Sequence, residues 1–121
     1  MAVRVQQEDF DVGFESRALQ QPTVGAIALF VGTVRSLSED NSVTAMTIEH
    51  YPGMTEAEIS RIEDEARDRW PLMDVTVVHR VGRLLAGEQI VLVAVSSAHR
   101  QPAFDAAQYI MDFLKTDAPF W

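Results

Sequence analysis

One side chain capable of amine chemistry stands out in this 121-residue sequence. Lysine and arginine together number ten, nine of them are arginine, and the remaining one is Lys115. Lys115 falls at the last turn of an expected helix, where a cation is favoured by the negative end of the helix dipole. Arginine would cap a helix equally well, whereas proton transfer by an amine requires lysine. From the residues alone, a helix cap and a reactive amine both remain open.

A second candidate site is the run S-S-A-H-R at residues 96–100, where an expected buried strand ends and an expected helix begins. Such a junction directs backbone N–H groups and the positive end of the helix dipole at one point, which is typical of an anion site. His99 and Arg100 would add an imidazole and a guanidinium, which together favour phosphate. The alternative is that both side chains cap nearby carbonyls. No nucleophile-elbow pattern supports a serine nucleophile activated by His99.

A third candidate is the run F-V-G-T-V-R at residues 30–35, which ends an expected strand at Arg35. Gly32 predicts a β-bulge or a close approach of two backbones. The spacing is not that of a P-loop, and Arg35 taken alone is typical of a solvated strand end. The histidines lie on separate expected elements without metal-ligand spacing, so no metal site is predicted. These histidines are His50, His79 and His99.

The composition narrows the class of protein. The net charge is −8, whereas nucleic-acid and anionic-membrane surfaces require a basic face. The absence of cysteine excludes thiolate catalysis, disulfides and cysteine-ligated metals. No basic region followed by an apolar run opens the chain, and no apolar stretch approaches the ~18 residues of a membrane span. We therefore expect a soluble cytoplasmic protein.

The elements that must position these side chains can be predicted from apolar patterning. Four strands rich in β-branched residues are expected, at residues 24–35, 43–51, 75–82 and 89–98. Residues 1–22 indicate little beyond a short strand at the start. Two helices complete the pattern. We therefore predict one α+β domain over residues 1–121, with a mixed, largely antiparallel sheet and two main helices.

The first helix is expected to begin at a capping box formed by Thr55 and Glu58, and to stop at Pro71. The acidic residues 63–65 are expected to lie on its solvated face. The second helix is expected to start near Pro102, where the missing N–H of proline has no cost. Lys115 would then lie in the last turn of that helix.

Four stretches, in order from residue 24 to residue 121, resemble the large, catalytic subunit of molybdopterin synthase. They are GAIALFVGTVR, TIEHYPGMTEAEI, EARDRWPLMDVTVVHRVGRLLAGE and VAVSSAHRQPAFDAAQYIMDFLKTDAPFW. The resemblance implies an α+β fold with a hammerhead-like β element. It also implies a central homodimer that carries a small ubiquitin-like sulfur-carrier subunit at each end.

The resemblance further implies a sulfurtransferase reaction in molybdenum cofactor biosynthesis. The C-terminal thiocarboxylate of the carrier delivers two sulfurs to cyclic pyranopterin monophosphate, a pterin phosphate, which makes molybdopterin. The step needs no metal or dissociable cofactor.

Matching the motifs residue by residue implies that Lys115 is the catalytic lysine. The substrate-binding residues are implied to be Thr33, Val34, Arg35, His99 and Arg100. In the family the two halves of the site come from different protomers, so His99 and Arg100 are expected to serve the Lys115 of a neighbour. Many members carry lysine where this chain has Thr33. Members also continue past A-P-F-W with a second lysine and a tail that contribute to the pocket, whereas this sequence ends at Trp121.

Two other classes remain open from the sequence. One is a non-catalytic, dimeric α+β module that binds a ligand or regulates a partner. The other is an interaction protein, for which Pro119, Phe120 and Trp121 would form a docking patch. Insertion of a ubiquitin-like partner's tail beside Lys115 would favour the enzyme over both.

Overall fold

The computed structural model describes residues 2–35 and 45–116. The elements in chain order are β1 (Ala2–Gln6), α1 (Val12–Ala18), β2 (Ala26–Thr33), β3 (Ala45–Ile48), α2 (Met54–Arg69), β4 (Leu72–Arg80), β5 (Gly82–Leu85), β6 (Gln89–Ser97) and α3 (Arg100–Thr116). Four strands form one sheet in the order β1-β4-β6-β2, and β3 pairs with β5 in a second sheet. The Pro119-Phe120-Trp121 patch lies outside the described residues.

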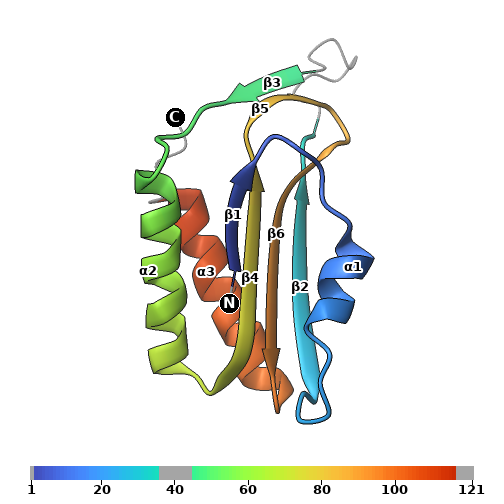
Figure 1. Cartoon of the computed structure of the whole chain (residues 1–121), viewed down its shortest axis with the longest axis vertical. Helices are drawn as coiled ribbons and strands as arrows, with labels where there is room; N and C mark the ends of the chain where they lie inside the picture. The colour runs from blue at the N-terminus through green and yellow to red at the C-terminus, as the bar shows by residue number, and fades with distance from the viewer. Residues whose placement is uncertain (1, 36–44, 117–121) are drawn as a thin grey trace.

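The predicted α+β fold with a mixed, largely antiparallel sheet is confirmed. β6 pairs antiparallel with both β2 and β4, while β1 pairs with β4 in parallel. Figure 1 shows β3 running across the end of the four-stranded sheet, and this small β3–β5 sheet fits the expected hammerhead-like element. The expected helices correspond to α2 and α3. The short helix α1 and the strand β5 were not predicted.

Each face of the main sheet carries its own apolar layer, because successive side chains of a strand point to opposite faces. Val77 of β4 lies in a core with Ile59 of α2 and Ile110 of α3. Its neighbour Val78 lies in a separate cluster with Phe10, which precedes α1. Figure 1 accordingly shows α2 and α3 away from α1, with the sheet between them.

Helix α2 begins differently from the prediction. Gly53 occupies the N-cap position with φ of 82°, and its N–H donates to Glu56 Oε1 at 3.2 Å. Thr55 is fully buried inside the first turn, where its hydroxyl oxygen accepts from the Tyr51 N–H at 3.1 Å. The Thr55–Glu58 capping box was therefore wrong. A glycine that tolerates positive φ lets the chain turn into the helix earlier.

The expectation of a solvated 63–65 run was also wrong at its first residue. Glu63 has 0% exposure, whereas Asp64 is exposed and Glu65 is half-buried. Position 63 follows Ile59 by one helical turn, and α2 packs against both α3 and the sheet, so its buried stripe is wider than the apolar pattern indicates. Burial raises the pKa of Glu63 to about 8, and neither of its oxygens has a hydrogen-bond partner among the described residues.

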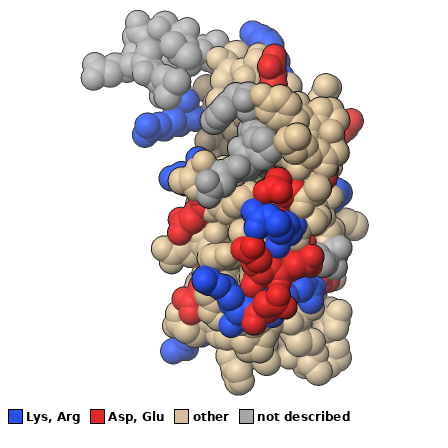
Figure 2. All heavy atoms as spheres, turned by 90° about the vertical axis from the view of Figure 1, so that its left-hand side faces the viewer, with Lys and Arg blue, Asp and Glu red and all other residues tan. Residues whose placement is uncertain are grey.

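The outer face of α2 carries charges of both signs. Arg61 pairs with Glu58 at 3.1 Å and with Glu65 at 2.6 Å. Figure 2 shows basic and acidic side chains interleaved on this side of the molecule. This face therefore lacks the single-sign basic patch that a nucleic acid would require.

No helix within the described ranges has the length and apolar character needed to cross a membrane. The predicted cytoplasmic location stays a prediction.

Candidate active site

Lys115 lies in the last turn of α3 and is exposed at two adjoining hollows. Their volumes are about 320 and 340 Å³, and both are lined by Phe30, Met111 and Lys115. The first is completed by Ala107, Gln108 and Asp112, and the second by Gly32, His79, Ile90, Val91 and Leu114. Most of these side chains are apolar, and Lys115 is the one lysine or arginine among them.

The surroundings of Lys115 bear on its two interpretations. Lys115 makes no hydrogen bond or ion pair with any residue of the described ranges. At the same helix end, the Thr116 hydroxyl donates to the Asp112 carbonyl at 2.8 Å. A carbonyl of the last turn is thus satisfied without the lysine, which leaves the amine available at the hollows.

The floor of the second hollow depends on Gly32. A Cβ at this position would lie 2.7 Å from Val91 Cγ1 and 3.3 Å from Phe30 Cε1. The register of β2 against β6 also shifts between Gly32 and Thr33. The predicted bulge at Gly32 is therefore confirmed by the register shift, whereas the atoms that a Cβ would meet belong to side chains and not to a neighbouring backbone. The missing side chain leaves this space to the side chains of Val91, Phe30 and Ile90, which all line the hollow.

His79 was missed as a lining residue by the sequence analysis. It is buried on β4, on the same face as Val77, and its Nδ1 lies 2.8 Å from the Arg80 carbonyl oxygen. Because a carbonyl can only accept, Nδ1 carries the proton and donates. Burial lowers the pKa of His79 to about 4, so the ring is neutral at pH 7. The hollow thus contains an uncharged imidazole near a cationic amine.

Thr33 is the last residue of β2, and Val34 and Arg35 follow it at the same end of the sheet as Lys115. Val34 is buried, and its backbone is held on both sides by the turn before β6. Its N–H donates to the Glu88 carbonyl at 2.9 Å, and its carbonyl accepts from the Gly87 N–H at 2.6 Å. Thr33 and Arg35 are exposed on either side of it. This arrangement brings Arg35 to the end of the molecule that holds Lys115.

His99 and Arg100 lie at the predicted junction, but at the opposite end of α3. Both are exposed, and the His99 N–H is 3.4 Å from Ser97 Oγ. Arg100 is the first residue of α3, so it lies roughly 22 Å along the helix axis from Lys115 at 1.5 Å per residue. A single chain therefore does not bring these two parts of the predicted site together.

The serines beside this junction have structural partners. The Ser97 hydroxyl donates to the Pro71 carbonyl at 2.8 Å, and Ser96 donates to the Asp74 carbonyl at 3.4 Å. Both serines are buried. Neither is placed as a nucleophile, which agrees with the missing sequence pattern.

Comparison with known proteins adds the decisive observation. The sequence model of the family described as MoaE protein matches residues 5–117. The chain belongs to the MoaE family. The molybdopterin synthase catalytic subunit of Ralstonia nicotianae is 53% identical, over 98% of this chain and 69% of its own length. The predicted resemblance to this catalytic subunit, and with it the sulfurtransferase class, is confirmed.

Solved structures agree with the MoaE assignment. The molybdopterin biosynthesis MoaE protein from Burkholderia ambifaria has a TM-score of 0.90 at 51% identity, covering 100% of this chain and 83% of that one. A protein–protein complex of subunits 1 and 2 of the molybdopterin-converting factor from Helicobacter pylori has a TM-score of 0.82 over 98% of this chain and 81% of that one. At 22% identity, the second likeness shows the shared fold.

Proposed function

We propose that the hollows beside Lys115 are the sulfur-transfer site of a molybdopterin synthase catalytic subunit. The C-terminal thiocarboxylate of a small ubiquitin-like carrier subunit supplies the sulfur, and cyclic pyranopterin monophosphate receives it. The observation that carries the proposal is the position of Lys115. It is the single lysine of the sequence, and it lines both hollows without a protein partner in the described ranges.

The shape of the hollows suits the end of a polypeptide. The family resemblance implies a carrier that ends in Gly-Gly, and such a tail has no side chains, so it can lie extended between Phe30 and Met111. Phe30 is 42% exposed on β2, which leaves an aromatic face for such a tail to cover. The terminal thiocarboxylate would then lie near Lys115, whose positive charge offsets its negative charge.

Lys115 has two tasks in this proposal. While the thiocarboxylate sulfur forms a bond to a ring carbon of the substrate, the bond from that carbon to a ring heteroatom breaks, and the ammonium donates a proton to the departing heteroatom. Water then hydrolyses the acyl–sulfur link to the carrier, which leaves the sulfur on the pterin and a carboxylate on the carrier. The amine regains its proton in that second step.

The substrate phosphate requires further cations. Arg35 extends from the segment after β2 at the Lys115 end, whereas His99 and Arg100 lie at the far end of α3. A guanidinium can hold phosphate through two parallel N–H donors. We therefore include a homodimer in the proposal, in which His99 and Arg100 of one protomer complete the Lys115 site of the other.

The direct test replaces Lys115 and supplies thiocarboxylated carrier and precursor. Lys115→Ala and Lys115→Arg are both expected to lower the rate of molybdopterin formation by roughly 10²–10⁴-fold, because guanidinium does not exchange protons at neutral pH. Arg17→Ala is the matched control, since Arg17 is an exposed cation in the last turn of α1. Wild-type rates in both Lys115 variants would contradict the catalytic role.

A further inference from the structure

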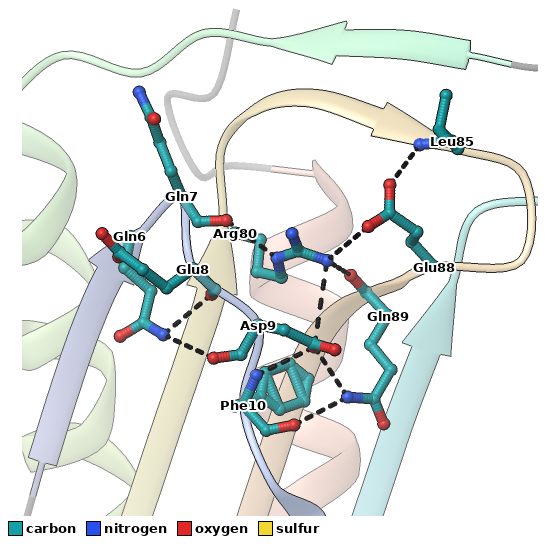
Figure 3. A network of polar contacts seen from close by, with 9 residues as sticks. All are labelled: Gln6, Gln7, Glu8, Asp9, Phe10, Arg80, Leu85, Glu88 and Gln89. Carbon is teal, nitrogen blue, oxygen red and sulfur yellow. Dashed lines mark hydrogen bonds and ion pairs between the residues drawn. The ribbon is translucent and has the colours of Figure 1, made fainter.

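The buried guanidinium of Arg80 lies at the centre of a polar network on the α1 side of the sheet. Arg80 is 7% exposed, and Figure 3 shows it between the β1–α1 connection and the start of β6. Its Nε donates to the Gln7 carbonyl at 3.1 Å, and its Nη1 donates to the Gln89 carbonyl at 3.0 Å. The same nitrogen lies 3.4 Å from Glu88 Oε1 and 3.8 Å from Asp9 Oδ1.

Glu88 links this guanidinium to the turn between β5 and β6. One carboxylate oxygen faces Arg80, and the other accepts from the Leu85 N–H at 2.6 Å. The Glu88 N–H donates in turn to the Leu85 carbonyl at 3.0 Å. The carboxylate therefore braces the turn from within while it is itself held by Arg80.

The braced turn holds the segment that carries Arg35. The Val34 N–H and carbonyl pair with the Glu88 carbonyl and the Gly87 N–H at 2.9 and 2.6 Å. These bonds come just after the register of β2 against β6 has shifted at Gly32 and Thr33. Beyond that shift, the backbone entering Arg35 is aligned by the turn rather than by the regular ladder.

We propose that Arg80 and Glu88 are positioning residues for Arg35. They act through the backbone of Val34 and fix where the Arg35 side chain leaves the sheet. This inference rests on the proposed function, in which Arg35 binds the substrate phosphate. Neither residue lines the hollows beside Lys115, so their effect on the reaction is indirect.

The two side-chain bonds of Glu88 differ in length. The contact with Arg80 is 3.4 Å and joins a buried guanidinium to a partly exposed carboxylate, whereas the bond from the Leu85 N–H is 2.6 Å. The low exposure of Arg80 reduces the screening of its charge by solvent. Truncating Glu88 removes both side-chain bonds, to Arg80 and to the Leu85 N–H, but leaves its carbonyl for Val34. The turn would remain, with freedom to shift against the end of β2.

A double-mutant cycle tests whether Glu88 positions Arg35. Glu88→Ala is expected to raise KM for cyclic pyranopterin monophosphate about fivefold, with kcat changed less, because binding rather than chemistry is disturbed. In an Arg35→Ala background the same change should have no further effect, since the group that it positions is gone. Equal fold-losses in both backgrounds, or a loss confined to kcat, would overturn the inference.

Matched variants separate positioning from general damage. Glu88→Gln has one acceptor oxygen, enough for the Leu85 N–H or for Arg80 but not for both, so its KM should lie between those of the wild type and Glu88→Ala. Glu58→Ala removes a half-buried glutamate that also pairs with an arginine, but on α2 and not at the turn, and should leave KM unchanged. Arg80→Lys keeps the charge without the planar fork and is expected to raise KM as Glu88→Ala does, with no added effect in the double variant.

Hydrogen exchange measures how firmly Arg80 and Glu88 hold the Val34 segment, and it does not depend on turnover. In Glu88→Ala, the Val34 and Gly87 amides should exchange about tenfold faster, while the Val93 amide in the core of the sheet keeps its protection. Unchanged exchange at Val34 would overturn the positioning role. If the wild-type protein made no product, the proposed function would fail, yet the exchange result would still decide whether Arg80 and Glu88 hold this segment.

Discussion

At the scale of single residues, the hollow beside Lys115 exists in its present shape because Gly32, which lines it, has no Cβ. An added Cβ at Gly32 would lie 2.7 Å from Cγ1 of Val91, its partner residue on β6. A side chain there would have to displace the strand or the valine. The same displacement would narrow the hollow that a carrier tail enters.

Gly32→Ala should therefore weaken both stability and carrier binding. Overpacking of this kind lowers the free energy of unfolding by about 1–3 kcal/mol, which a urea titration would show. The Kd for the carrier should rise at the same time. Gly13→Ala is the control, because Gly13 lies in α1, and its added Cβ would meet mainly the flexible Arg17 side chain at 3.1 Å. Wild-type stability and carrier affinity in Gly32→Ala would contradict this account.

At the scale of elements, α2 carries a buried carboxyl group that the proposed reaction does not use. Burial raises the pKa of Glu63 to about 8, and the nearby Arg67 only partly opposes this. The folded protein thus holds Glu63 protonated at neutral pH, while the unfolded chain releases the proton above its ordinary value near 4.5. Stability from this group is complete below pH 4.5 and is lost as the pH rises to about 8.

The shifted pKa of His79 changes the stability with pH in the opposite direction, over a different pH range. The pKa of His79 is about 4 in the folded protein, below the ordinary value of 6.5. The stability that this residue contributes is therefore fully present above pH 6.5 and is lost as the pH falls to about 4. Between pH 4.5 and 6.5 the two groups largely offset each other. Above pH 6.5, Glu63 alone of this pair changes the stability.

The free energy of unfolding should accordingly fall by about 2 kcal/mol between pH 6.5 and 8 in the wild-type protein. Glu63→Gln should flatten this decline, because its amide does not titrate. Asp64→Asn is the control, since Asp64 is exposed on the same helix and should leave the decline in place. Chemical denaturation at several pH values measures all three, and an unchanged slope in Glu63→Gln would refute the assignment.

The elements that the sequence predicted correctly are those with strong local signals. The β-branched runs of β4 and β6 and the apolar stripe of α3 do not depend on knowing what packs against them. Helix α1 has seven residues, too few for a stripe to repeat, and its Asp11 cap becomes evident only in the bond from the Phe14 N–H. The burial of Glu63 needed knowledge of two packing surfaces at once.

The candidate site divides in the same way. Lys115 and Arg35 could be proposed from motifs, and the structure brings them to one end of the sheet. The lining roles of Phe30 and His79 depend on strand pairing and on the direction of α3, neither of which residue spacing reveals. The Arg80 network joins parts of the chain more than seventy positions apart, so no local sequence pattern could predict it.

At the scale of the whole molecule, the order of β6 and α3 determines which residues can share a site. α3 runs back along the sheet after β6 (Figure 1). Arg100 therefore begins the helix at one end, and Lys115 lies in its last turn at the other. β2 ends beside Lys115, which keeps Arg35 with the lysine in one chain. A site that uses Arg100 as well as Lys115 therefore needs two copies.

Mixed dimers would reveal this division. Lys115→Ala and Arg100→Ala protomers are each expected to be impaired alone. Combined in equal amounts, they should form half mixed dimers, in which one of the two sites has every group intact. Activity should then return to about a quarter of the wild-type value, by the arithmetic of random two-fold pairing.

The matched combination pairs Lys115→Ala with Arg35→Ala. Both residues lie at the same end of one chain, so every site in a mixed dimer would lack one of them, and no activity should return. Differentially tagged protomers, purified through both tags, would confirm that the mixed species was assayed. If the activity of the Lys115→Ala and Arg100→Ala mixture were no higher than the two variants contribute when assayed separately, Arg100 would not serve a neighbouring lysine. The substrate phosphate would then have to be held by groups at the Lys115 end, with Arg35 the foremost of them.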